Sequence, residues 1–292
     1  HIDSHVDINK LSEKLFQLGH EHEIDEQIFD FEFTPNRGDC LSLNGILRDL
    51  RAFYKINLKK NIYEFDIPEL TLDFKNLSQS SCKKITFLRI DIEDNIKNYK
   101  GALQEYFDDM ELNKNNFFTD ISNFIMYETG QPTHCYESDK VIKGLKLDFV
   151  DKKFQFETLL DTSIEVSGKN LIFFNKNNEA INLAGIIGSK NSACSRDTMS
   201  VIIECAHFDP ESIIGKSVKY GINSDAAHRF ERGTDYNCHD YVLRRFLRII
   251  EEHAEIISAE IFSQSYSDFK IKKIPFNLSK INTILGTKIN EA

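Results

Sequence analysis

Six short apolar segments follow one another between residues 144 and 205, each closed by turn residues. They are GLKLDFVD, KKFQFETLL, SIEVSG, NLIFFN, AINLAGIIG and SVIIEC, at 144–151, 152–160, 163–168, 170–175, 180–188 and 200–205. Such spacing is typical of strands joined by turns, whereas a βαβ winding needs a helix between successive strands. The pattern therefore predicts a sheet-rich sandwich. KKITFLRIDIE, at 83–93, adds a further strand because it is rich in β-branched residues.

Helical periodicity surrounds this strand-rich region. A first helix is expected at 7–19, with Asp7 as its N-cap and Gly19 at its end. A second helix is expected to begin at Asp39, which would cap the apolar segment that ends at Phe53. Three further helices are expected at 100–110, at 121–129 and at 236–257, the second of them ended by Gly130. Another helix is expected to begin at Asp209-Pro210, with Ile213, Ile214 and Val218 facing inward. The chain is thus expected to have an α+β fold.

The expected domain organisation has three parts. A small helical unit at 1–60 is followed by a central sheet-rich sandwich with packed helices at 80–265. The segment at 59–80 is polar and weakly periodic, and we interpret it as a linker or edge segment. A further small unit begins at 270–292 and is cut short by the end of the chain. Both flanking units are expected to resemble small winged-helix domains.

Charge limits how the chain could meet a nucleic acid. It has 36 Lys and Arg against 46 Asp and Glu, a net charge of −10, so its overall field repels RNA. The window 215–250 is the exception, with seven basic and four acidic side chains and a net charge of +3. Any RNA contact is therefore expected to be local. The alternative is that these basic side chains only pair with acidic neighbours.

The six cysteines carry no CxxC or Cys/His spacing, which argues against a zinc site and against a disulfide framework. Reduced thiols favour a cytoplasmic protein. There is no apolar signal core and no apolar run long enough to span a membrane, so no membrane partner is expected. GHEHE, at 19–23, could suggest a metal tract, but we interpret its two histidines as solvated surface residues.

Two polar residues stand beside apolar segments and are candidate functional groups. Glu204 closes the strand SVIIEC, where a carboxylate could recognise a ligand; the alternative is a strand end that reaches water. His134 follows the turn Gly-Gln-Pro, which could present an imidazole for chemistry or simply hold a structural histidine. Cys135 is not expected to act with His134, because neighbouring residues on an extended chain point to opposite sides.

Two further segments are polar or rich in glycine. The run at 183–188 places Gly185 and Gly188 where backbone or ligand could approach closely, but it is not a GxGxxG motif, and the chain contains no Walker sequence. The segment at 223–235 holds Asp225, His228 and Glu231, which could form a catalytic cluster. Arg229 and Arg232 lie beside them, so a structural network of ion pairs and caps is the preferred interpretation.

Five segments together resemble one family in order. They are TPNRGDCLS, TDISNFIMYETGQPTHCYE, LAGIIGSKNSACS, VIIECAHFDP and NSDAAHRFERGTD, and they span residues from about 30 to 260. Each is modest alone, but five in register are specific for the β subunit of bacterial phenylalanyl-tRNA synthetase. The resemblance implies a phenylalanine-tRNA ligase subunit in a cytoplasmic heterotetramer. Its partners would be the α subunit and tRNA(Phe). ATP and magnesium would act at the aminoacylation site on the α subunit, with no cofactor or metal in this segment.

The resemblance also implies an editing site that hydrolyses mischarged tyrosyl-tRNA. Glu204 takes the position of the family's glutamate, which would accept the phenol proton of a tyrosyl ester, and His134 that of its histidine, which would position the ester or the attacking water. Gly188, Ser224 and Ala226 match residues that line the pocket. A site of this kind tells the two amino acids apart by binding the hydroxyl that phenylalanine lacks.

The chain departs from the family pattern at several positions. Asn113 stands where the family has an arginine, Ser189 replaces a glycine, Ser224 replaces a threonine, and HCYE replaces HAFD. Only a short segment separates Gly19 from the strand at Ile28, which leaves no room for the family's tRNA-binding OB-fold. Two alternatives therefore stay open. One is a structural, subunit-interaction module with decayed editing; the other is a free-standing aminoacyl-tRNA deacylase.

Overall fold

The N-terminal unit packs two helices around a two-stranded hairpin. A computed structural model describes residues 6–57 and 60–290. In it, the unit contains α1 (Ile8–Gln17), β1 (Glu21–Asp25), β2 (Ile28–Glu32), a 3₁₀ helix (Pro35–Cys40) and α2 (Leu43–Leu50). A small core, made of Leu15, Leu47, Leu50 and Ile56, holds it together. The strand at Ile28 is confirmed as β2, whereas β1 was not predicted, and the hairpin that they form makes the unit α+β and not purely helical.

The two helix starts of this unit test the capping predictions. Asp7 caps α1 as predicted: its Oδ1 accepts hydrogen bonds from the backbone N–H groups of Asn9 (2.8 Å) and Lys10 (3.3 Å). The prediction that Asp39 caps the second helix is wrong. Ser42 caps α2 instead, and Asp39 pairs with the guanidinium of Arg37. Residues 35–40 form a 3₁₀ turn first, so the helix begins later than the apolar pattern indicated.

The histidines of GHEHE are buried, so their assignment to solvated surface was wrong. His20 and His22 are only 1% and 8% exposed. The Nε2 atom of His20 lies 3.0 Å from Oδ2 of Asp49, and Nδ1 of His22 lies 2.9 Å from the carbonyl oxygen of His20. His20, Cys40 and Asp49 bring possible metal ligands together, but the guanidinium of Arg37 already donates to Cys40 and Asp49. The group is therefore a structural ion-pair network.

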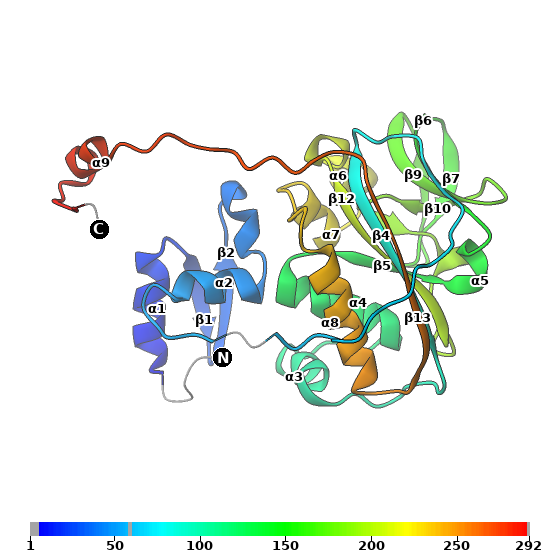
Figure 1. The fold of residues 1–292 in the computed structure, drawn as a ribbon, viewed down its shortest axis with the longest axis horizontal. Coiled ribbons are helices and arrows are strands. Elements are labelled where there is room, and N and C mark those ends of the chain that lie inside the picture. Colours follow the sequence, from blue (N-terminus) through cyan, green and yellow to red (C-terminus); the bar gives the residue numbers. More distant parts are fainter. Residues whose placement is uncertain (1–5, 58–59, 291–292) are drawn as a thin grey trace.

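The central unit is built on two facing sheets (Figure 1). The four-stranded sheet is antiparallel, in the order β13-β4-β12-β5. Its strands are β4 (Cys82–Ile92), β5 (Thr133–Glu137), β12 (Ser200–Phe208) and β13 (Ile256–Ser265). β13 pairs with β4 along its length, although the sequence indicated only a polar stretch there. Its side chains are mostly half-buried, as expected of an edge strand.

The five-stranded sheet has the order β11-β10-β9-β6-β3, and β7 and β8 form a separate hairpin. The strands are β3 (Phe74–Asn76), β6 (Leu145–Asp151), β7 (Phe154–Glu157), β8 (Ser163–Val166), β9 (Lys169–Asn175), β10 (Ala180–Leu183) and β11 (Ile187–Gly188). All six strand-like segments at 144–205 are confirmed. Phe87 and Ile202 of the first sheet share a core with Leu147 and Phe173 of the second, so a sandwich is formed.

Helices cover the other face of the four-stranded sheet. α3 (Gly101–Asp109), α4 (Phe117–Thr129) and α8 (His239–Glu251) lie there (Figure 1). The core beneath them joins Leu88, Ile90, Val201 and Ile203 to Ile121, Ile125, Val242 and Phe246. Gly130 ends α4 in a left-handed conformation, as predicted. The helix predicted at 236–257 is shorter, because β13 begins at Ile256. A buried ion pair, Arg245 with Glu128 at 2.8 Å, ties α8 to α4.

Short helices connect the remaining parts. They are α5 (Ser138–Val141), α6 (Lys216–Tyr220), α7 (Asp225–Phe230) and α9 (Leu278–Leu285). Asp209-Pro210 opens only a 3₁₀ turn, and no side-chain cap forms there. Ile213 is buried as predicted, whereas Ile214 and Val218 are 56% and 83% exposed, against the prediction. Among the described residues, none of the helices combines the length and apolar character needed to cross a bilayer.

The segment between the N-terminal unit and β4 belongs to the central core. The N–H of Leu70 donates to the carbonyl oxygen of Ile261 in β13 at 2.8 Å, and the N–H of Ile261 donates to the carbonyl oxygen of Pro68 at 2.8 Å. Leu70, Leu72 and Phe74 are buried between the sheets, and β3 forms the edge of the five-stranded sheet. The N-terminal unit also contacts α7, because Nε of Arg229 donates to the carbonyl oxygen of Leu41 at 3.0 Å.

Candidate functional site

A cleft of about 410 Å³ opens between the two sheets and the helices α4 and α7. β5 and β12 supply one wall, and the β10–β11 turn supplies another. His134, Gly188, Glu204, Ser224 and Ala226, singled out above, all line it. They come from four separate elements, so only the folded sandwich brings them together.

Glu204 lies in the middle of β12, with strand residues on both sides. It is 4% exposed, so the alternative of a strand end that reaches water is wrong. Burial raises its pKa to about 7, because the charged form loses its hydration. Hydrogen bonds from Tyr136 (2.6 Å) and Asn182 (3.4 Å) to Oε2 act against this rise. The carboxyl group thus changes its charge near neutral pH.

His134 lies directly opposite Glu204 in the antiparallel pair of β5 and β12. The two side chains point to the same face of the sheet, as paired residues do. Burial lowers the pKa of His134 to about 4, so the imidazole is neutral near pH 7. Its Nε2 atom is buried and has no hydrogen-bond partner among the described residues.

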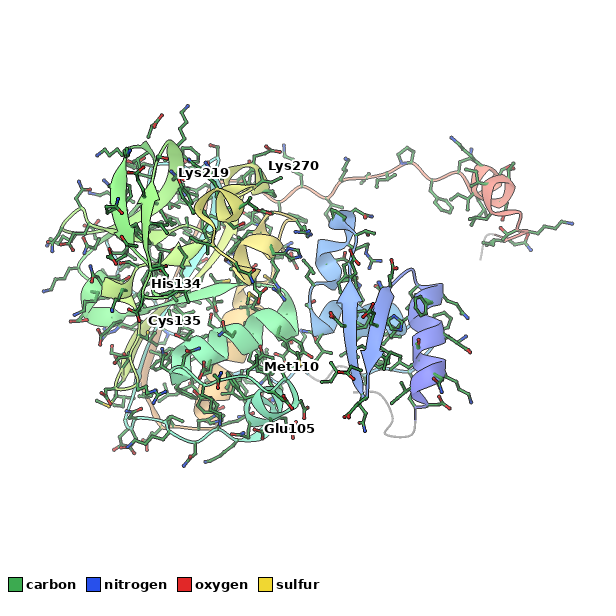
Figure 2. All side chains as sticks on the ribbon, turned by 180° about the vertical axis from the view of Figure 1, so that it is seen from behind. Glu105, Met110, His134, Cys135, Lys219 and Lys270 are labelled. Atoms are coloured by element: carbon green, nitrogen blue, oxygen red, sulfur yellow. The ribbon has the colours of Figure 1, made fainter. Side chains whose placement is uncertain are left out.

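Cys135 follows His134 along β5, and both residues are labelled in Figure 2. Its sulfur lies 3.4 Å from the carbonyl oxygen of Phe118, in the core beneath α4. Burial raises the pKa of this thiol well above its ordinary range. Since Cys135 and His134 occupy opposite faces of the sheet, the prediction that they do not act as a nucleophile pair is confirmed.

Two glycines shape the wall around His134. A side chain at Gly188 would bring its Cβ to 2.3 Å from Cε1 and 2.7 Å from Nε2 of the imidazole. Gly185 has φ +70°, and a Cβ there would meet Ile213 at 2.9 Å. Position 188 requires glycine because the imidazole of His134 lies too close for a side chain. Position 185 requires glycine because of its left-handed backbone conformation and because Ile213 lies close to it.

Ser224 and Ala226 form the wall at α7. The hydroxyl of Ser224 donates to the carbonyl oxygen of Ile186 at 2.8 Å and accepts from the N–H of Ala227 at 3.1 Å. It thus caps α7 and ties that helix to the β10–β11 turn. Ala226 is half-buried and presents only a methyl group. This wall is held in place by backbone contacts and leaves no hydroxyl proton for a ligand.

The sequence analysis missed two residues of the cleft region, Tyr136 and Asn182. Both are buried and hydrogen-bonded to Glu204. Tyr136 could have been found, since it lies two residues after His134 on an extended strand and so shares its face. Asn182 carried a weaker signal: an amide inside the apolar run AINLAG has to find a hydrogen-bond partner when that run is buried.

In the segment 223–235 the predicted cap is present at Ser224, but no ion pair forms among its described residues, so the preferred network of ion pairs and caps is confirmed only in part. Glu231 accepts a hydrogen bond from the backbone of Gly215, and Arg232 donates to His228. Among the acidic and basic side chains and the histidine of this segment, Asp225 alone lines the cleft. No arginine or lysine lines the cleft in the ranges that the structure describes, and Asn113 does not line it either. The cleft offers a carboxyl group, a neutral imidazole and apolar walls, which suits a ligand that combines an aromatic body with a hydroxyl group.

Comparison with known proteins places this sandwich in a family. A family model described as the B3/4 domain matches residues 82–255, more than half of the chain. The chain belongs to the B3/4 domain family. The matched residues begin with β4 and include most of the cleft, so the five lining residues singled out above all lie within the B3/4 domain.

The chain is similar in sequence to curated proteins named as phenylalanine–tRNA ligase β subunits. The phenylalanine–tRNA ligase β subunit of Francisella tularensis is 30% identical over 275 residues, which is 91% of this chain and 34% of that protein. That of Fusobacterium nucleatum is 30% identical over 285 residues, with the same coverage. The chain thus spans about a third of the length of these relatives.

A solved structure also aligns with the chain. It is an N-terminal fragment of the phenylalanyl-tRNA synthetase β subunit from Pyrococcus horikoshii, which aligns at 11% identity with a TM-score of 0.43, over 98% of this chain and 81% of that chain. Likeness at this level does not define a shared fold. The mixed α+β architecture is established by the strands and helices described above.

Proposed function

We propose that this chain is part of a phenylalanine-tRNA ligase β subunit and that its cleft hydrolyses tyrosyl-tRNA formed in error. The buried Glu204 beside His134 and Gly188 is the observation that carries the proposal. The similarity of the B3/4 domain to curated β subunits supports it. The enzyme would act in the cytoplasm with an α subunit, which would hold ATP and magnesium at its own aminoacylation site.

Selection would depend on the hydroxyl group of the ligand. An apolar synthetic site rejects a substrate with an extra hydroxyl only weakly, so a second site must bind that hydroxyl. A tyrosine ring in this cleft would supply a donor to Oε1 of Glu204, to which no described residue donates, whereas a phenylalanine ring would leave that oxygen without a partner. A hydrogen bond to a charged group contributes about 1.5–3 kcal/mol, which corresponds to roughly 10- to 150-fold selection.

Hydrolysis would need little more than positioning. An aminoacyl ester is already activated, so a correctly placed water and backbone donors for the oxyanion would suffice. His134 is the candidate to orient the ester or accept a proton from the water, because its imidazole is neutral near pH 7. Nε2 is enclosed beside Gly188. Nδ1 is therefore the ring nitrogen that could form a hydrogen bond with the ester or the water.

The test is deacylation of preformed tyrosyl-tRNA(Phe) by the full enzyme with its α subunit. We expect Glu204→Ala to reduce tyrosyl-tRNA hydrolysis at least tenfold, and His134→Ala to slow it at saturating substrate. Glu165→Ala, a half-exposed carboxylate on β8 outside the cleft, is the matched control and should leave the rate unchanged. Unchanged hydrolysis in both cleft variants would refute the assignment.

A second candidate function is a structural module that has lost hydrolysis. The lack of an arginine or lysine in the described lining of the cleft favours it, since no cationic anchor holds the tRNA end there. In that case the wild-type enzyme would clear tyrosyl-tRNA no faster than spontaneous hydrolysis. Clearance well above the spontaneous rate would exclude this candidate.

A further inference from the structure

A buried hydrogen-bond chain ends on Glu204. Nδ2 of Asn182 lies 2.8 Å from the hydroxyl oxygen of Tyr136, and that oxygen lies 2.6 Å from Oε2 of Glu204. The three residues are 3%, 0% and 4% exposed. They come from β10, β5 and β12, so the chain of hydrogen bonds crosses from one sheet to the other.

The direction of these hydrogen bonds follows from the donor groups. An amide NH₂ only donates, so the hydroxyl oxygen of Tyr136 accepts from Asn182. The single phenol proton of Tyr136 then points to Oε2 of Glu204. A short hydrogen bond from a hydroxyl to a carboxylate is among the stronger ones in proteins, particularly when it is buried.

The two carboxyl oxygens of Glu204 therefore have different roles. Oε2 accepts from Tyr136 and Asn182, whereas no described residue donates to Oε1. Because Glu204 lines the cleft, Oε1 is the oxygen left for a ligand. We propose that Tyr136 is a positioning residue for ligand selection, whose hydroxyl holds Oε2 of Glu204 so that Oε1 alone accepts a phenolic hydroxyl. This inference rests on the proposed function.

The histidine and the thiols around Glu204 are neutral near pH 7. His134 faces it from β5 and has a pKa lowered to about 4 by burial. The thiols of Cys82, Cys135 and Cys205 lie close enough to be affected by its charge, and burial raises their pKa values well above the ordinary range. Asp225 lines the same cleft from α7 and is exposed. Tyr136 and Asn182 thus provide the direct stabilisation of the charged form of Glu204.

Tyr136→Phe tests the proposal, because it removes the hydroxyl and keeps the ring. We expect the KM for tyrosyl-tRNA to rise about tenfold. The kcat should change little, because His134 is unchanged in this variant. The preference for the tyrosyl over the phenylalanyl ester should fall by about the same factor as the KM rises. The pH midpoint of tyrosine selection should move upward by about one pH unit, because the ionised carboxylate loses a donor. The full enzyme is assayed between pH 6 and 9.

Tyr99→Phe is the matched control. The hydroxyl of Tyr99 also donates to a buried carboxylate, Asp120, at 2.6 Å, but Asp120, unlike Glu204, does not line the cleft. Tyr99→Phe should lose about as much stability as Tyr136→Phe. It should keep the wild-type preference for the tyrosyl ester and the wild-type pH midpoint of tyrosine selection. If Tyr136→Phe folds poorly, Asn182→Ala leaves the ring in place and should change preference in the same direction by a smaller factor.

The outcomes separate this inference from the proposed function. A wild-type enzyme without any preference for tyrosyl ester overturns both. A wild-type preference that survives unchanged, or increases, in Tyr136→Phe and Asn182→Ala overturns the role of Tyr136 alone. A raised KM together with a shifted pH midpoint, absent in Tyr99→Phe, supports it.

Discussion

Glu204, which is buried, and His134, which is half-buried with an enclosed Nε2, predict two opposite pH dependences of stability. The pKa of Glu204 rises from its ordinary value of 4.5 to about 7 on folding. Between these values the folded state keeps a proton that the unfolded state has lost, so the free energy of unfolding falls as pH rises. The stability that Glu204 contributes is complete below pH 4.5 and is lost by pH 7. The loss amounts to about 3 kcal/mol, because one pKa unit corresponds to about 1.4 kcal/mol.

His134 has the reverse sign. Its pKa falls from 6.5 to about 4 on folding, so in this range only the unfolded state binds the proton. Its contribution to stability is complete above pH 6.5 and is lost as pH falls to 4, again by about 3 kcal/mol. In the wild-type protein the two effects largely cancel between pH 4.5 and 6.5.

Glu204→Gln and His134→Asn separate the two effects. Urea unfolding at a series of pH values gives the free energy of unfolding of each variant relative to wild type. We expect Glu204→Gln to gain relative stability as pH rises from 4.5 to 7, and His134→Asn to gain it as pH falls from 6.5 to 4. Relative stabilities that stay constant with pH would refute the burial of these two groups.

Three other substitutions have defined costs in the free energy of unfolding. Gly188→Ala should lower the free energy of unfolding by about 1–3 kcal/mol, because the new methyl group clashes with His134. In a His134→Ala background the same substitution should cost much less. An equal cost in both backgrounds, measured by urea unfolding, would contradict the clash. Glu128→Ala should cost about 3–5 kcal/mol, because it leaves the buried guanidinium of Arg245 unpaired. Asp240→Ala breaks an exposed pair and should cost under about 1 kcal/mol, so similar melting temperatures for these two variants would argue against burial of the first pair.

Local signals allowed much of the fold to be predicted. The strands at 144–205 and β4 were found because apolar runs between turn residues are visible without knowledge of their neighbours. The N-cap at Asp7 and the stop at Gly130 were found for the same reason. Glu204, His134 and Gly188 were singled out by their local sequence, whereas Ser224 and Ala226 were found only through the resemblance to a family. The spacing of these five residues in the sequence does not indicate that they meet.

Features that depend on distant partners were missed. β13 and β1 contain many polar residues without a clear alternation, and only pairing with another strand identifies them as strands. His20 and His22 are buried because Asp49, Ser12 and a backbone carbonyl satisfy their nitrogens. The burial of Glu204 depends likewise on donors from two other strands, which a reading along one strand could not supply.

The position of β13 at the edge of the sheet determines where a stable fragment of this protein can end. The family match ends at residue 255, just before the strand that covers one side of β4. A fragment cut at that boundary would turn β4, eleven residues long and largely apolar, into an open edge that invites self-association. Cutting at residue 82 would also remove Leu70, Leu72 and Phe74 from between the sheets. The smallest piece expected to keep both edges of β4 paired and the core between the sheets complete therefore extends from about residue 67 to 266.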